Sequence, residues 1–167
     1  MGWLDNRTIR LVGESQVIAA AIEAQGGRIV SDGDCDALVH VAIAPAAIPA
    51  HEISHARWRE ALDAGLDQRF LLAKEFASAR RASGETGAIV FVGAPEQALG
   101  ADHAAAAGGL GNLTKTLGVE WARDGIRVNA VLTFDSGETL GNLVAYLLSD
   151  YAAYVTGAVM GVGLDDG

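Results

Sequence analysis

This sequence of 167 residues is poor in cysteine, proline and basic side chains. Cys35 is the single cysteine, so no disulfide can form within the chain, and a reducing, cytoplasmic location is expected. The 12 Lys and Arg residues are outnumbered by 21 Asp and Glu, and the net charge of -9 argues against binding to nucleic acid or to an anionic membrane surface. The sequence also lacks apolar runs of membrane-spanning length and the pattern of a signal peptide.

Half of the residues are apolar, which predicts a substantial core in a single domain covering residues 1–167. Short apolar runs and longer runs with helical spacing alternate along the chain. Strands are expected at 8–12, 28–30, 37–43, 87–92, 126–132 and 158–162, and helices at 16–25, 57–82, 104–123 and 139–148. This alternation predicts an α/β fold with a Rossmann-like, doubly wound and mostly parallel sheet.

Three motifs carry a family resemblance. Residues 111–117 read Gly-Asn-Leu-Thr-Lys-Thr-Leu, residues 125–131 read Gly-Ile-Arg-Val-Asn-Ala-Val, and residues 154–157 read Tyr-Val-Thr-Gly. The first two resemble the long helix and following strand of the short-chain dehydrogenase/reductase family, and the third resembles the approach to its last strand. The resemblance implies a Rossmann-like fold whose active members use NAD(P) for hydride transfer.

The positions at which the family keeps its four catalytic side chains hold different residues here. According to the resemblance, Gly65 stands for the asparagine, Ala94 for the serine, His103 for the tyrosine and Ala107 for the lysine. Hydride transfer to a carbonyl needs an acid that protonates the oxygen and a cation that lowers the pKa of that acid. Neither is supplied by alanine or glycine, so we expect no catalytic residue in this chain.

The phosphate-binding loop of the family is also reduced. The resemblance implies a glycine-rich turn whose backbone amides meet the cofactor pyrophosphate at a helix N-terminus. This chain has only Gly13-Glu14-Ser15, with a single glycine and a negative charge where phosphates would lie. We therefore expect no cofactor in this chain, and NAD(P) only in an active partner subunit.

Two further segments of the family are missing from the interior of the chain. Only six residues separate the strands at 28–30 and 37–43, where the family inserts a helix, a strand and another helix. A parallel crossover usually takes a dozen residues or more, so an irregular sheet, truncated at the cofactor edge, is expected. After Val131 the family has a mobile substrate lid, whereas residues 132–137 here lead directly to the next helix.

The segments through which the family assembles are retained. The resemblance implies that helices 57–82 and 104–123 pair with those of a second subunit, and that the C-terminal strand near 154–163 makes a further two-fold contact. The leading hypothesis is therefore an inactive subunit that joins an active paralogue in a heteromeric, tetrameric NAD(P)-dependent dehydrogenase and stabilises or regulates it. Trp121 is expected at such an interface rather than in the core.

Two other hypotheses remain open. The first is a residual oxidoreductase, or a binder of small ligands or acyl-CoA, that uses the remaining cleft near His40 and His103; the second is a homo-oligomeric scaffold. His40 lies at the end of a strand and is interpreted as a hydrogen-bonded core residue.

A zinc-protease-like pattern also occurs in the sequence. His51-Glu52-Ile53-Ser54-His55 matches His-Glu-x-x-His, and Glu75 stands at a spacing that suits a third ligand. Pro49 just upstream and Arg57 just downstream do not suit a buried metal helix. The segment is interpreted as the start of a surface helix, and no metal site is expected.

Overall fold

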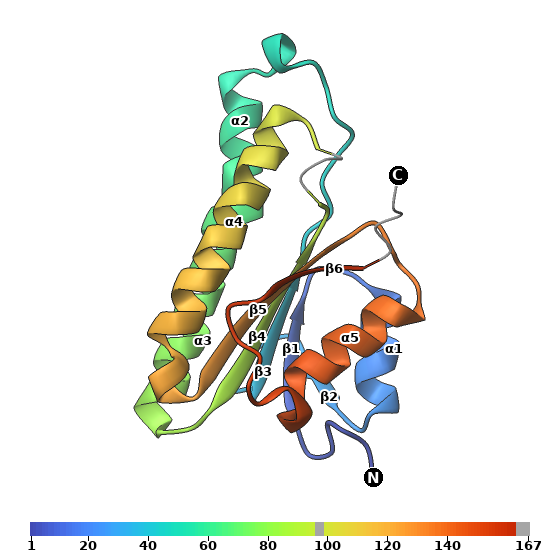
Figure 1. Ribbon diagram of the computed structural model, residues 1–167, viewed down its shortest axis with the longest axis vertical. Helices are drawn as coiled ribbons and strands as arrows, with labels where there is room; N and C mark the ends of the chain where they lie inside the picture. The colour runs from blue at the N-terminus through green and yellow to red at the C-terminus, as the bar shows by residue number, and fades with distance from the viewer. Residues whose placement is uncertain (96–98, 163–167) are drawn as a thin grey trace.

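The computed structural model describes residues 1–95 and 99–162 as one six-stranded parallel sheet with the strand order β2-β1-β3-β4-β5-β6 (Figure 1). The strands are β1 (Thr8–Val12), β2 (Arg28–Val30), β3 (Ala37–Val41), β4 (Gly87–Gly93), β5 (Ile126–Thr133) and β6 (Val159–Val162). All five neighbouring pairs are parallel. The predicted α/β fold with a doubly wound sheet is therefore confirmed.

Helices cover both faces of the sheet. On one face lie α1 (Gln16–Ala24) and α5 (Glu138–Leu148), and on the other lie α3 (Gln68–Ser83) and α4 (Ala101–Glu120), with α2 (His55–Leu62) extending beyond the sheet (Figure 1). Short 3-10 turns occupy Ala50–Glu52, Ala122–Asp124 and Asp150–Ala152. Since both faces are covered, the central strands are almost continuously buried, with six buried residues in succession in β4.

Two buried clusters form the core, one on each face of the sheet. Ile18, Val90 and Val144 belong to the cluster beneath α1 and α5. Phe76, Phe91 and Leu117 belong to the cluster beneath α3 and α4. Trp121 is buried in the second cluster, so its expected place at an interface is wrong. Trp121 is the residue after α4, and its carbonyl accepts from the Ile126 amide at the start of β5 at 3.2 Å, while its side chain packs in the cluster beneath α3 and α4. None of the helices in the described part of the chain has the length and apolarity that a membrane span requires.

The edge of the sheet at the short crossover from β2 to β3 is more regular than expected, since β2 pairs with β1 in parallel register, although residues 31–36 form no helix or strand. Val30, the last residue of β2, pairs with Arg10, and Ala37, the first residue of β3, pairs with Ile9. The end of β2 and the start of β3 thus lie at nearly the same level along β1. The chain has to cross β1, but it does not have to run back along the length of a strand. Asp36 fixes the end of the crossover, because its carboxylate accepts from the Thr8 amide at 2.7 Å and its own amide donates to the Thr8 carbonyl at 2.8 Å. The prediction of an irregular edge is therefore wrong, because β2 has only three residues and the chain does not need a long connection from its end to the start of β3.

The helix expected at 57–82 is interrupted by a π-helical turn, Asp63–Asp67, between α2 and α3. A Cβ at Gly65 would lie 2.8 Å from the Cβ of Ala106, so this turn lies directly against α4.

The C-terminal strand is also shorter than predicted. Residues 154–158 precede β6 and are attached to β5, since Asn129 Nδ2 donates to the Val155 carbonyl at 2.9 Å and the Val128 amide donates to Thr156 Oγ1 at 3.1 Å. Residue 163 lies outside the described residues.

Candidate functional site

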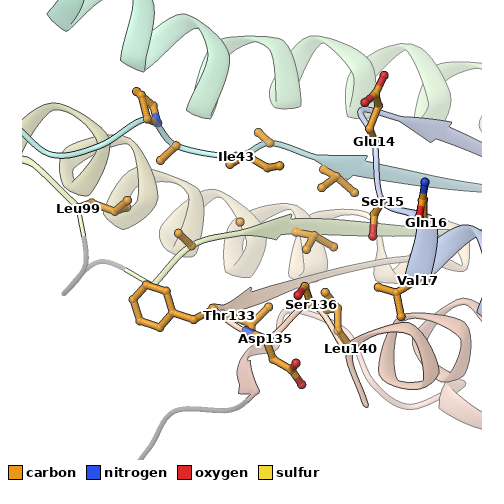
Figure 2. Close-up of a pocket in the computed structure, with 18 of the residues that line it drawn as sticks. Glu14, Ser15, Gln16, Val17, Ile43, Leu99, Thr133, Asp135, Ser136 and Leu140 are labelled. Carbon is orange, nitrogen blue, oxygen red and sulfur yellow. The ribbon is translucent and has the colours of Figure 1, made fainter. Parts of the chain in front are cut away.

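A cleft of about 760 Å³ opens at the carboxyl ends of the central strands, the edge at which open α/β sheets bind ligands. Figure 2 shows Glu14 to Val17 at one end of the cleft, Leu99 at the other, and Ile43 and Thr133 between them. Most of the walls are apolar. The lining residues come from the β1–α1 junction (Glu14, Ser15, Gln16, Val17), from β3 and its loop (Val41 to Ala47), from β4 and its loop (Val92, Gly93, Ala94, Leu99) and from the β5–α5 segment (Thr133 to Ser136, Leu140).

The β1–α1 junction is the reduced phosphate loop of the sequence prediction. Gly13 has a φ of +87°, and a Cβ there would overlap the Val41 carbonyl oxygen, so this position needs glycine. Ser15 caps α1, its hydroxyl accepting from the Ile18 amide at 3.4 Å. Glu14 is exposed at the same helix end, and Asp135 lines the opposite wall. Among the described residues the cleft is lined by two carboxylates and no Lys or Arg, a charge pattern that does not fit a pyrophosphate.

The four positions that the resemblance assigns to the catalytic side chains are brought together. Gly65 from the π-helical turn, Ala94 after β4, and His103 and Ala107 from α4 all line a small cavity of about 50 Å³ beside the main cleft. These four positions therefore share one cavity, and their assignment to the catalytic side chains stays a prediction. Of the four, only His103 has a side chain that can exchange a proton, and no hydroxyl or ammonium group comes from the other three.

Two side chains near this site are buried, Arg69 and His40. His40 is named from the sequence together with His103, although it lines neither cavity, whereas Arg69 lines the small cavity and does not follow from the sequence patterns. Arg69 of α3 lines the small cavity although only 3% of the residue is exposed, and its Nη2 donates to the Val92 carbonyl at 2.8 Å. Burial lowers the pKa of Arg69 to about 10, so the guanidinium stays charged at neutral pH. Within the described residues, its Nε has no hydrogen-bond partner.

His40 of β3 is buried, as the sequence predicts, but the expected hydrogen bond is wrong for its Nδ1, which has no partner within the described residues. Burial, and then the charge of Arg69, lower the pKa of His40 to about 4. The imidazole is therefore neutral at physiological pH. A sequence pattern cannot reveal such a pair, since Arg69 reads as a polar position on a helix.

A buried ion pair holds the start of α4. Asp102 has no exposed surface; its Oδ2 accepts from Arg57 Nε at 2.8 Å, and its Oδ1 accepts from the His103 amide at 2.9 Å. Burial opposes ionisation of this carboxyl group, but the hydrogen bonds from Arg57 and His103 outweigh it and lower the pKa of Asp102. The pair ties α2 to α4 and fixes the place of His103.

Replacing Asp102 by Ala should lower the free energy of unfolding by about 1–3 kcal/mol at neutral pH, because Arg57 loses its charged acceptor. Since the folded pKa of Asp102 is depressed, this contribution is complete above the unfolded pKa of about 4 and disappears as the pH falls through the folded value. Urea unfolding of both proteins between pH 2 and 7 measures the difference. Asp67→Ala, which removes an exposed partner 3.7 Å from Arg59, is the control and should change stability little. A constant difference across this pH range would contradict the assignment.

The zinc-protease-like pattern does not form a ligand cluster. His51 and Glu52 lie in the 3-10 turn before α2, and His55 begins α2 itself. All three are exposed, and Glu75 forms an ion pair with Arg10 of β1 at 3.0 Å. Nowhere in the described part of the chain do three or more His, Cys, Asp or Glu side chains gather as metal ligands would.

Comparison with known proteins identifies the family. The family model described as enoyl-(acyl carrier protein) reductase matches residues 12–134. Together with the parallel sheet and the cleft at its carboxyl edge, this match shows that the chain belongs to the short-chain dehydrogenase/reductase family.

Two relatives of known activity show how this chain differs in length. It is 33% identical over 162 residues to cis-4-hydroxycyclohexanecarboxylate dehydrogenase from Sinomonas cyclohexanicum, a comparison that covers 78% of the chain but 65% of that protein. It is 27% identical over 203 residues to 3beta-hydroxysteroid dehydrogenase 1 from Eggerthella lenta, covering 92% of the chain and 76% of that protein. Because 203 positions exceed the 167 residues of the chain, the second relative has internal segments that this chain lacks.

Solved structures agree on the fold. A short-chain dehydrogenase/reductase family oxidoreductase from Brucella ovis, in complex with a partially ordered NAD, has a TM-score of 0.83 to this chain. The comparison covers 95% of this chain and 100% of that chain at 18% identity. The Rossmann-like architecture is therefore shared with a structure that holds NAD, although its sequence is distant.

Proposed function

We infer that this chain is a non-catalytic subunit that assembles with an active short-chain dehydrogenase/reductase paralogue in a heteromeric, tetrameric NAD(P)-dependent dehydrogenase. The observation that carries this proposal is the small cavity where Gly65, Ala94, His103 and Ala107 meet. The backbone of the catalytic site is retained, but the acid and the cation that hydride transfer requires are not provided there. Two of its relatives are named as dehydrogenases.

According to the same proposal, this chain binds no dinucleotide, and the active partner holds the NAD(P). Glu14 at the start of α1 and Asp135 on the opposite wall would repel the pyrophosphate. The crossover from β2 to β3 also contains no strand that could enclose an adenine ring. Both ends of a dinucleotide therefore lack the groups that would hold it.

The outer faces of α2, α3 and α4 support assembly. Trp58, Phe70 and Val119 are large apolar side chains on these helices, and Val119 is 78% exposed. A second exposed group lies near the C-terminus, where Tyr151, Tyr154 and Val159 face solvent. Apolar side chains of this size mark interaction surfaces when they gather on one face. The proposed partner contacts are thus the helices near 57–82 and 104–123 and the segment near 154–163.

The experiment combines a measurement of cofactor binding with substitution of His103, the one ionisable side chain among the four positions. Calorimetry on the isolated chain should detect no saturable binding of NADH or NADPH at millimolar concentration. In the complex with an active paralogue, His103→Ala should leave kcat and KM unchanged, because no proton passes through this imidazole. Saturable binding of either cofactor to the isolated chain, or loss of turnover in an intact His103→Ala complex, would contradict the proposal.

A second candidate function is favoured by the size of the cleft. The cleft of about 760 Å³ falls in the range of small-molecule sites. His103 lines its smaller neighbour, and His40 lies buried on β3 close enough to Arg69 for that charge to affect its pKa. Titration of the isolated chain with an acyl-CoA in the same calorimeter separates the two functions, because saturable binding would favour a ligand-binding subunit over an assembly subunit.

A further inference from the structure

Arg69 differs from the other buried or half-buried arginines of the described structure in its partners. Arg80 lies within 4 Å of three carboxylates, Arg57 pairs with Asp102, and Arg127 donates to four backbone carbonyls. Arg69 has one hydrogen bond, to the Val92 carbonyl, and no carboxylate within ion-pair distance among the described residues. A charge that is 97% buried is costly unless something pairs with it.

The position of Arg69 suggests what could pair with it. Its guanidinium lies against Gly93 at the end of β4, where a Cβ would be 3.2 Å from Nη2 and 3.4 Å from Nη1. Because residue 93 is glycine, no side chain from the end of β4 covers the guanidinium. Arg69 and Gly93 both line the cavity of about 50 Å³, which has room for a water molecule or a carboxylate group.

The small cavity adjoins the large cleft. Both are lined by the same stretch of the β3 loop and by the end of β4 and its loop (Ala42, Ile43, Ala44, Gly93, Ala94, Leu99). Leu99 marks this end of the cleft in Figure 2, and Glu14 lies at the opposite end. The combined site is therefore apolar in the middle, positively charged at Arg69 and negatively charged near Glu14 and Asp135.

We propose that the combined site binds a small organic acid, with its carboxylate on Arg69 and its apolar remainder in the cleft. Planar guanidinium groups match carboxylates, and Nη1, which donates no hydrogen bond among the described residues, could donate to a carboxylate oxygen. Neutral His40, close to Arg69, adds no competing positive charge. Glu14 and Asp135 disfavour the reverse orientation. This proposal does not rest on assembly with a paralogue, since every group named belongs to this chain.

The alternative is a purely structural arginine that holds the end of β4 through its bond to the Val92 carbonyl. The two explanations predict opposite effects of Arg69→Met on the empty protein. A buried guanidinium kept for a ligand is a net cost, and replacing it with an apolar side chain of similar length should raise the midpoint of thermal unfolding. A structural arginine should lower that midpoint when it is removed.

The direct test titrates the full chain with hexanoate, followed by calorimetry or protein NMR, and with hexanamide, which has the same shape without the charge. We expect hexanoate to bind at least tenfold more tightly than hexanamide. Arg69→Met should abolish this preference, and Arg69→Lys should retain part of it. Arg59→Met, at an exposed position on α2, is the matched control and should leave it unchanged.

Several results would overturn the proposal. Equal affinity for hexanoate and hexanamide would remove the role of the charge, and unaltered hexanoate binding by Arg69→Met would place the carboxylate elsewhere. Chloride that binds at Arg69 as tightly as hexanoate would reduce the site to an inorganic anion site. Failure of hexanoate to bind at 10 mM, a concentration on the order of weak ligand affinities, together with a lower unfolding midpoint for Arg69→Met, would leave the structural explanation.

Discussion

The double substitution Phe70→Glu and Val119→Glu is expected to weaken assembly with an active paralogue at least about 100-fold, which corresponds to roughly 2.7 kcal/mol. Phe70 is 40% exposed and Val119 78% exposed, so both side chains have surface free to meet a partner. In the proposed complex, each glutamate would instead be buried without a partner charge. Analytical ultracentrifugation of the two subunits over a concentration series measures the shift.

Ala20→Glu provides the matched control for this experiment. Ala20 is exposed on α1, on the opposite face of the sheet, so the substitution adds the same charge away from the proposed interface. The control should assemble as the wild type does, and circular dichroism should show all variants folded. Assembly that resists the double substitution would exclude the outer helix face as the partner surface. Removing residues 154–167 is less informative, because Val155 and Thr156 hydrogen bond to β5 and the deletion would damage the fold.

Arg127→Met is expected to lower the free energy of unfolding by about 3 kcal/mol and the melting temperature by about 6–12 °C. Arg127 Nη1 donates to the Leu147 carbonyl at 2.6 Å and to the Ala152 carbonyl at 3.1 Å, while Nη2 donates to the Ser149 carbonyl at 2.9 Å. These oxygens belong to the last turn of α5 and the segment after it. The Ser149 and Ala152 carbonyls also accept from the amides of Ala152 and Val155, at 3.2 and 2.9 Å, whereas the Leu147 carbonyl, in the last turn of α5, has Arg127 as its donor among the described residues.

A comparison of the melting temperatures of Arg127→Met and Arg123→Met isolates the effect of losing the Arg127 hydrogen bonds from the effect of losing a positive charge. Arg123 is exposed in the 3-10 turn after α4, and its replacement should change the melting temperature little. The same two variants report on assembly, because Arg127 places α5 and the residues leading to β6. Equal melting temperatures for both variants would mean that the carbonyl groups at the end of α5 are satisfied in another way.

Much of the fold is predictable because its signals are local. The sequence predicts the limits of β1 and β2 to the residue, since Gly13 and Gly26-Gly27 end the neighbouring segments. The apolar runs of β4 and β5 reflect burial on both faces. The π-helical turn at Gly65 escapes prediction because it depends on the close approach of Ala106, which is a contact between distant segments. The crossover differs from its prediction because register, rather than loop length alone, determines how far the chain must travel.

The candidate site is predictable only in part, for the same reason. Motif positions bring Gly65, Ala94, His103 and Ala107 to one place, since the family resemblance already contains the fold. Arg69 cannot be found in this way, although His40 is named from the sequence. The significance of Arg69 comes from its burial close to His40, with an unpaired nitrogen on each side chain within the described residues, and no spacing in the sequence encodes that environment.

Native mass spectrometry of this chain, co-expressed with an intact paralogue from the same genome, tests the central claim most directly. We predict a stable heterotetramer in which only the intact subunit carries NAD(P) and in which the oxidoreductase activity belongs to the complex. A homo-oligomer or monomer of this chain that ignores the paralogue, or that oxidises substrate with bound NAD(P) on its own, would contradict this claim.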